Sequence, residues 1–328
     1  MMRKKTYSRL LAGAMAVMLT AGAVCTPQVV WAAKTVASET KTESIKRVTV
    51  HDPSIVKDRE TGTYYVFGSH MATAKSDDLV NWTQIAKDYE FPLAGKDDPV
   101  YGNVVENFAE SFRWAGYNDG DCATTDSKLA VWAPDVFWDD AYEWADGTKG
   151  AYLMYYTASS TWKRSCIGVA VSKTIEGPYA HLDTLVYSGM TSKEGTDGNS
   201  KRDTKWDNDY LNFNELLKKG SKGGGIDAVS DDWFKADGSY NTAVAPNCID
   251  PAIIKSTDGK IYMSYGSWSG GIFLLEIDKE TGYPIHPAPS PDNNTDAYYG
   301  KRLAGGMHNS IEGPYVLHEK ENGYFKKL

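Results

Sequence analysis

Residues 52–56 read Asp-Pro-Ser-Ile-Val, and residues 62–65 read Gly-Thr-Tyr-Tyr. The same order returns at Asp250 and at Glu312: an acid, a short apolar run, a polar turn with glycine, and a second run with tyrosine. The distance from the acid to the tyrosine is twelve residues in all three copies. Apolar runs bounded by Gly and Asp are typical of paired β-strands. The sequence therefore predicts a repeated β-unit that an acid precedes.

A fourth copy begins at Asp135, where the inserted residues Tyr142–Ala145 stretch the acid-to-tyrosine distance to seventeen residues. Similar β-units packed around an axis place the same position of every unit in the same region. If each acid opens the innermost strand of its unit, the acids face one central cavity. Several carboxylates around such a cavity supply the protonated and the ionised group that glycoside hydrolysis requires.

Composition excludes some classes of partner. The chain has 328 residues, ten Trp, twenty-one Tyr and a formal net charge of -8. Nucleic acids and anionic membranes bind clustered cations, and the sequence has no Lys/Arg block beyond its N-terminus, so neither partner is expected. Tyr and Trp rings suit stacking on sugar rings, although most of them are expected to fill a β core.

The N-terminus has the pattern of a secretion signal over residues 1–32: a basic start, an apolar Ala-rich run and a Val30-Trp31-Ala32 cleavage site. The apolar run is short for a membrane-spanning helix. Residues 33–47 are predicted to be a disordered lead-in. A secreted protein is expected, and a lipid anchor at Cys25 is less favoured because Val24 stands where a small residue is required.

Residues 48–328 are predicted to be nearly all β, with two polar stretches, Pro92–Lys128 and Gly189–Pro246, that interrupt the repeat. Insertions of this size are expected at strand ends, where they shape a cleft, and the role of the second stretch stays open. A single short helix is predicted over Tyr210–Leu217. Strands are predicted over Ser54–Val56, Tyr64–Gly68, Ala151–Thr157, Ile167–Val171, Ile253–Lys255, Ile261–Tyr265 and Ile272–Ile277.

Cysteines and histidines do not form a metal-binding pattern. Export leaves Cys122, Cys166 and Cys248, which allow at most one disulfide and one free thiol, with the pairing open. His70 and His308 are not paired on one element at ligand spacing, so hydrogen-bonded structural roles are expected for both.

The repeats begin at residues 52, 135, 250 and 312, which gives three units and the start of a fourth. A closed propeller requires its final blade to meet the first. We therefore expect an N-terminal fragment of a longer protein, or a changed reading frame in the last few residues, and any continuation of the chain past Leu328 stays open.

The motifs resemble glycoside hydrolase family 43 and, within it, the extracellular arabinan endo-1,5-α-L-arabinosidases. This resemblance implies an all-β fold, a five-bladed β-propeller of which about three blades and the start of the fourth are present. It also implies a polysaccharide substrate, and a monomer is expected. The matching segments are Val50–Ile55, Gly68–Ala72, Ser76–Trp82, Val131–Asp135, Asn247–Pro251, Tyr265–Ile272 and Ser310–Tyr315.

The inverting mechanism of the family implies separate roles for three acids. Asp52 matches the general base, Glu312 the general acid, and Asp250 a third carboxylate whose negative charge raises the pKa of the acid. Inversion needs a gap of about 6.5–9.5 Å between acid and base. The resemblance implies contacts with the sugar for Asn247, Ser267, Trp268 and Ser269, with core packing as the alternative for Trp268. Asp135, at the equivalent repeat position, is predicted to line the cavity or to cap a strand, and has no proton-transfer role.

A second Ile-Glu-Gly-Pro-Tyr string at residues 175–179 competes with Glu312. Glu176 follows a strand instead of opening a unit, so we expect it on an outer turn. The resemblance also implies a calcium ion in the central channel of the full-length parent, with a histidine from a later blade. No ligands for it are assignable in this sequence.

Together these patterns predict hydrolysis of internal α-1,5-L-arabinofuranosidic bonds of arabinan by the full-length parent, and whether the fragment is active stays open. One alternative is an exo-acting β-xylosidase or α-L-arabinofuranosidase of the same family. Another is a non-catalytic carbohydrate-binding propeller. The Ser-Trp-Ser-Gly-Gly string at residues 267–271 favours the arabinanase, and the presence of all three acids argues against a non-catalytic protein.

Overall fold

The computed structural model describes residues 44–86, 97–115, 131–159, 164–191, 216–226, 230–318 and 325–327. All but the first of these residues belong to one compact unit, Ile45–Leu328. The predicted signal peptide and residues 33–43 lie outside the described residues, and residues 44–47 have no regular secondary structure. Within the described ranges, no helix has the length and apolar character needed to cross a membrane.

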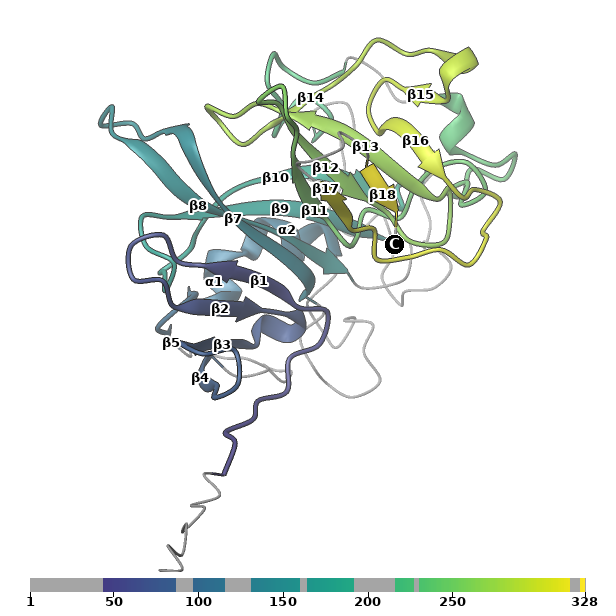
Figure 1. Ribbon diagram of the computed structural model, residues 1–328. Coiled ribbons are helices and arrows are strands. Elements are labelled where there is room, and N and C mark those ends of the chain that lie inside the picture. The colour runs from purple at the N-terminus through teal and green to yellow at the C-terminus, as the bar shows by residue number, and fades with distance from the viewer. Residues whose placement is uncertain are drawn as a thin grey trace, which may run out of the picture. The chain divides into compact units, whose positions relative to one another are not determined.

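The described residues form antiparallel sheets with few helices, an all-β architecture (Figure 1). The first sheet has the order β1-β2-β3-β4, and the second has the order β10-β9-β8-β7. Their strands are β1 (Ser54–Lys57), β2 (Tyr64–Phe67), β3 (Thr73–Ser76), β4 (Thr83–Ala86), β7 (Val131–Glu143), β8 (Lys149–Ser159), β9 (Ser165–Ser172) and β10 (Ala180–Ser188).

The third sheet has the order β11-β12-β13-β16-β15, with β14 paired to β13. Two short two-stranded ladders, β5-β6 and β17-β18, complete the pairing in the described residues. These strands are β11 (Ala252–Lys255), β12 (Ile261–Tyr265), β13 (Ile272–Ile277), β14 (Pro284–Ile285), β15 (Thr295–Asp296), β16 (Gly300–Ala304), β5 (Asp97–Asp98), β6 (Gly102–Asn103), β17 (Val316–His318) and β18 (Phe325–Lys327).

The repeat predicted from the sequence corresponds to the start of each sheet. β1, β11 and β17 begin two to four residues after Asp52, Asp250 and Glu312, and each lies at the edge of its sheet. β7, which contains Asp135, is also an edge strand and contacts both β1 and β11, while β11 contacts β17. The acid-bearing strands therefore lie next to one another, and the other strands of each sheet follow outward from them.

All seven strands predicted from the sequence are confirmed, with ends that differ by a few residues. The predicted helix over 210–217 lies outside the described residues except at its end. The insertion Tyr142–Ala145 lengthens the β7-β8 hairpin, whose strands have 13 and 11 residues. β8 and β9 are buried almost throughout, which explains why their sequences are continuous apolar runs without a polar face.

The first polar stretch lies between β4 and β7, at strand ends as expected, and its described part contains two helices and two short strands. Residues 97–115 contain α1 (Val104–Asn107) and α2 (Ala109–Ala115), and α2 packs on β8 and β9. Trp114 is fully buried and donates a hydrogen bond to the Ser165 carbonyl, while the Arg164 guanidinium lies 4.3 Å from its ring. The polar composition of the stretch gave no indication of these few large apolar residues. They complete the core instead of shaping a cleft.

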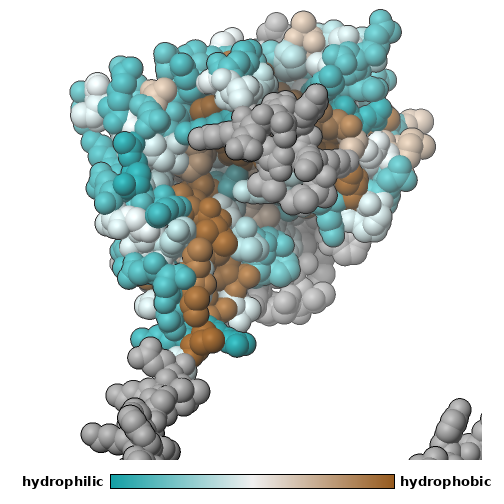
Figure 2. Space-filling model, viewed as in Figure 1, coloured by the Kyte–Doolittle hydropathy of each residue, from teal (hydrophilic) through white to brown (hydrophobic). Residues whose placement is uncertain are grey.

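Cys166 and Cys248 are free, buried thiols, and Cys122 lies outside the described residues. The short 3-10 helices are η1 (Ser69–Met71), η3 (Asp231–Trp233) and η4 (Pro291–Asn293). Figure 2 shows a mainly hydrophilic face, with hydrophobic residues gathered in a band that rises from the first described residues. Ile45 and Ile55 are among the exposed large hydrophobic residues.

Candidate active site

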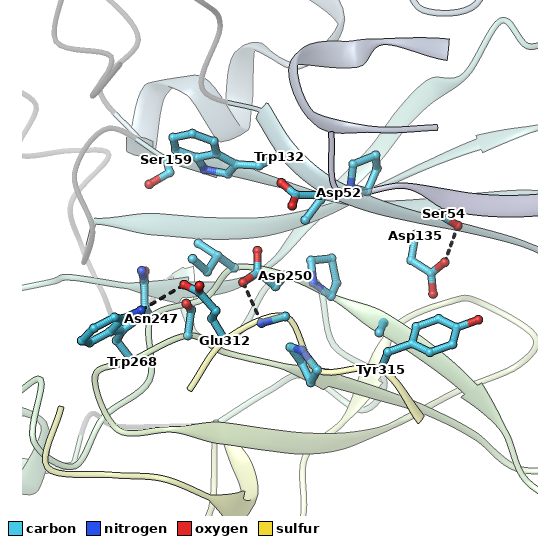
Figure 3. Close-up of a pocket in the computed structure, with 18 of the residues that line it drawn as sticks. Asp52, Ser54, Trp132, Asp135, Ser159, Asn247, Asp250, Trp268, Glu312 and Tyr315 are labelled. Atoms are coloured by element: carbon cyan, nitrogen blue, oxygen red, sulfur yellow. Dashed lines mark hydrogen bonds between the residues drawn. The ribbon is translucent and has the colours of Figure 1, made fainter. Parts of the chain in front are cut away.

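One cavity of about 900 Å³ lies among the acid-bearing strands, a volume within the range of about 300–1,000 Å³ that is typical of ligand sites. It brings together every site residue predicted from the sequence, although these come from segments far apart in the chain (Figure 3). These residues are Asp52, Asp135, Asn247, Asp250, Ser267, Trp268, Ser269 and Glu312.

Asp52 and Asp250 occupy the same local structure in two sheets. Each has a left-handed backbone, with φ of 48° and 55°, directly before a proline. Aspartate tolerates this conformation better than most residues do. A Gly-Ser pair after the second strand holds the loop in each case: the Ser69 N–H bonds the His51 carbonyl, and the Gly266 N–H bonds the Ile249 carbonyl.

One oxygen of the Asp52 carboxylate contacts two polar side chains. Ser69 Oγ donates to Asp52 Oδ2 at 2.7 Å, and His51 Nδ1 lies 2.7 Å from the same oxygen. The Ser69 hydroxyl oxygen in turn accepts a hydrogen bond from the Ala133 N–H at 3.1 Å, which orients its proton toward Asp52. Among the described residues, Asp52 Oδ1 has no hydrogen-bond partner, so this oxygen is left to the cavity.

Asp250 is the carboxyl group whose protonated form the site favours. Burial, the main cause, together with the negative charges of Asp52 and Glu312, raises its pKa to about 7. The Gly313 N–H donates to Asp250 Oδ2 at 3.3 Å and opposes this shift. This hydrogen bond also ties Asp250 to the residue that follows Glu312.

Glu312 accepts a hydrogen bond from Trp268 Nε1 at 3.0 Å on its Oε2 atom. The Trp268 N–H also bonds the Ile311 carbonyl at 2.6 Å, so the tryptophan contacts both the backbone and the side chain of this segment. Trp268 and Ser269 have φ of 47° and 35°, a strained conformation for residues other than glycine. Trp268 is 40% exposed, which argues against the alternative that it only fills the core.

The small polar residues of the cavity are deeply buried. Asn247, Ser267 and Ser269 are 2–3% exposed. Asn247 Oδ1 has no hydrogen-bond partner among the described residues, although it is inaccessible to solvent. A buried polar atom without a partner is unfavourable, so a sugar hydroxyl that reached it would relieve that cost.

Asp135 lines the cavity, yet both of its carboxylate oxygens accept hydrogen bonds from the protein. Ser54 Oγ donates to Oδ1 at 2.6 Å, and the Ile253 N–H donates to Oδ2 at 2.6 Å. Burial raises the pKa of Asp135, and these hydrogen bonds oppose the shift. Of the two sequence-based interpretations, cavity lining agrees with this position, whereas Asp135 lies within β7 and does not open a strand.

Glu176 lies on a turn between β9 and β10 and does not line the cavity. Lys75 Nζ and the Tyr65 hydroxyl each donate to its Oε1 atom at 2.6 Å. These hydrogen bonds, first that of Lys75, lower the pKa of Glu176. An ionised carboxylate in an ion pair outside the cavity is unsuited to proton donation, as the position on an outer turn predicted.

The sequence interpretation missed several cavity residues, including His51, Trp132, Ser159 and His308. It also missed Ser69, which donates a hydrogen bond to Asp52. The Gly-Ser pair at 68–69 is repeated at 266–267, and this internal match was the signal that could have found Ser69.

In the ranges that the structure describes, no group of three or more His, Cys, Asp or Glu side chains could hold a metal ion. The rings of His70 and His308 instead pack against Trp132 and Trp268, at centroid distances of 5.9 and 5.6 Å. No step of the reaction proposed for this site runs through a metal.

Four carboxyl groups, those of Asp52, Asp135, Asp250 and Glu312, line one cavity between antiparallel sheets, an arrangement compatible with glycoside hydrolysis. The chain is 36% identical over 283 residues to the extracellular endo-α-(1→5)-L-arabinanase 2 of Bacillus subtilis, which covers 85% of this chain and 44% of the relative. No protein-family model matches the chain.

Two crystal structures show the same relationship. The endo-1,5-α-L-arabinanase of Thermotoga petrophila has 34% identity and a TM-score of 0.56, over 85% of this chain and 47% of that one. A glycoside hydrolase of family 43 from Bacillus licheniformis has 36% identity and a TM-score of 0.56, over 86% and 47%. The chain spans about half the length of these relatives. It is a homologue of the endo-arabinanases of glycoside hydrolase family 43, as its motifs indicated.

Proposed function

We propose that this chain carries the catalytic acids of an extracellular glycoside hydrolase that cleaves internal α-1,5-L-arabinofuranosidic bonds of arabinan with inversion. The observation that carries the proposal is the convergence of Asp52, Asp250 and Glu312 on one cavity. The relatives at 34–36% identity are named endo-arabinanases, and those from Bacillus subtilis and Thermotoga petrophila are named extracellular. This supports arabinan as substrate and secretion as the destination. We also propose a monomer as the working unit.

In the proposed reaction, Asp52 acts as the general base. Its free Oδ1 atom takes a proton from water while the water oxygen attacks the anomeric carbon. Glu312 acts as the general acid and gives its proton to the departing glycosidic oxygen, so that one C–O bond forms as the other breaks. Trp268 holds Glu312 Oε2, which leaves Oε1 to carry the proton. Asp250 lies behind the acid and orients it through Gly313.

Sugar recognition is assigned to the buried polar groups of the same cavity. The Asn247 amide and the hydroxyls of Ser267 and Ser269 are placed to bond furanose hydroxyls, and the exposed Trp268 ring is placed to support a sugar face. Burial makes these contacts specific because a sugar that lacks the matching hydroxyl leaves them unpaired.

We further infer that the sheets are blades of a five-bladed propeller. The inference is supported by the repeated acid-strand unit and by the series of adjacent edge strands β1, β7, β11 and β17. In such a fold the inner strands surround the axis, where the acids then lie.

The test is hydrolysis of linear arabinan by this chain and by the variants Asp52→Asn and Glu312→Gln. Loss of a general base or acid is expected to reduce kcat about 10²–10⁴-fold. Glu176→Gln is the matched control because Glu176 shares the local sequence of Glu312 but lies outside the cavity. Oligosaccharides as the first products, with β-anomers seen by proton NMR, would support internal cleavage with inversion.

Other outcomes would reject parts of the proposal. Monosaccharide as the first product would replace the endo assignment with the exo alternative. Full activity of Asp52→Asn would show that the base is another residue. Binding of arabino-oligosaccharides without any hydrolysis would identify a carbohydrate-binding protein.

A further inference from the structure

Asp135 is the one acid of the four repeats that the proposed reaction does not use. It occupies the middle strand of the three that contact one another in the order β1, β7, β11. Its carboxylate joins all three, since it belongs to β7 and accepts hydrogen bonds from Ser54 of β1 and from the backbone of Ile253 in β11. We propose that Asp135 is a positioning residue that sets the separation between Asp52 and Asp250.

The connection to each acid is short. Ser54 stands two residues after Asp52, and Ile253 stands three residues after Asp250, so each bonded group lies at the start of the strand that the acid precedes. A shift of β1 relative to β11 would therefore move one acid relative to the other. Both hydrogen bonds measure 2.6 Å.

The directions of these hydrogen bonds are determined by the groups involved. The Val136 N–H donates to Ser54 Oγ at 3.2 Å, which leaves the Ser54 hydroxyl proton for Asp135 Oδ1. The Ile253 N–H is only a donor and requires an acceptor. Two donors therefore meet the two oxygens of one carboxylate, which lies among the cavity residues near Ser54 in Figure 3.

Asp139, on the same strand, is a matched control. Asp139 is more buried than Asp135, with 3% of its surface exposed, and burial raises the pKa of both carboxyls. Its Oδ1 atom accepts a hydrogen bond from the Ala141 N–H within its own strand, and it does not line the cavity. Asp139 thus shares the strand and the chemistry of Asp135 without a hydrogen bond to another strand.

The inference rests on the proposed function where its test measures catalysis. Asp135→Ala removes both hydrogen bonds and is expected to lower kcat on arabinan at least about tenfold with KM within about threefold, because small misplacements of catalytic groups are costly. Asp135→Asn should recover most of the activity, since its oxygen accepts from Ile253 and its amino group donates to a free lone pair of Ser54 Oγ. Asp139→Ala should keep kcat within about twofold of the parent protein.

A second readout does not depend on catalysis. NMR titration of the Asp250 carboxyl, whose pKa is raised to about 7, reports its burial and its distance from Asp52. Asp135→Ala is expected to lower this pKa toward the ordinary value of 3.8, while Asp139→Ala leaves it in place.

The catalytic and the titration measurements distinguish failure of the proposed function from failure of the positioning role. If the parent protein does not hydrolyse arabinan, the proposed function fails, and the titration alone decides the positioning role. A raised KM with unchanged kcat in Asp135→Ala would show that Asp135 binds substrate directly. Equal effects of Asp135→Ala and Asp139→Ala on kcat and on the Asp250 titration would show that Asp135 has no specific positioning role and would overturn the proposal.

Discussion

Replacement of Asp250 by Asn is expected to stabilise the folded protein at alkaline pH while it removes a group that the proposed reaction needs. The pKa of Asp250 is about 7 in the folded protein, compared with an ordinary value of 3.8. A carboxyl that binds its proton more tightly when folded makes the protein more stable as the pH falls through about 7, and that gain is complete near the ordinary value. Above the folded pKa, the ionised group destabilises the fold.

The magnitude follows from the size of the shift. Between the folded pKa of about 7 and about pH 5, the folded group is protonated and the unfolded group is ionised over roughly two pH units. At about 1.4 kcal/mol per unit, the free energy of unfolding therefore rises by at most about 3 kcal/mol. Asp250 keeps part of its surface exposed to the cavity, so solvent screening reduces the expected difference to about 1.5 kcal/mol. For a domain of this size, that difference corresponds to about 3–6 °C in Tm.

The assay is thermal unfolding of the parent protein and of Asp250→Asn at the two pH values. The variant should gain about 3–6 °C relative to the parent at about pH 8.5 compared with about pH 5. Asp146→Asn is the control, because Asp146 is exposed and hydrogen bonds from Thr148 lower its pKa to about 2. Both pH values lie above its folded and ordinary pKa, so its effect should not change between them. An Asp250→Asn difference that is also independent of pH would refute the burial of Asp250 and its raised pKa.

Three further outcomes are expected. Ser69→Ala removes a donor to Asp52, which should lower kcat on arabinan about tenfold because a hydrogen bond to a charged group contributes about 1.5–3 kcal/mol; an unchanged kcat would contradict this. Trp268→Phe removes the donor to Glu312 and should lower kcat on arabinan about tenfold, with a smaller loss on nitrophenyl arabinofuranoside, whose leaving group needs little protonation. Burial raises the pKa of the Cys166 thiol, so peptide mapping should find it alkylated by iodoacetamide only after unfolding, and equally rapid labelling of the native protein would exclude this burial.

Local patterns in the chain were sufficient to predict seven strands, and together with the family resemblance they indicated eight residues of the cavity. The acid, apolar run and Gly-containing turn depend on neighbouring residues, and the period of the repeat indicated that Asp52, Asp250 and Glu312 occupy equivalent positions. The Glu-Gly-Pro strings at 176 and 312 were separated in the same way, by their position relative to a strand. These features need no knowledge of long-range packing.

Contacts between distant segments required the folded chain. The polar stretch that contains Trp114 concealed a helix whose few apolar residues are buried against β8 and β9, a contact that composition does not register. Sequence assigned Asp135 either a cavity-lining or a strand-capping role, but only the structure shows that it lies within β7 and that its two oxygens bond different neighbouring strands. Periodicity along one chain specifies which face of a strand is apolar, but hydrogen bonds and pKa values depend on groups that meet only when the sheets pack together.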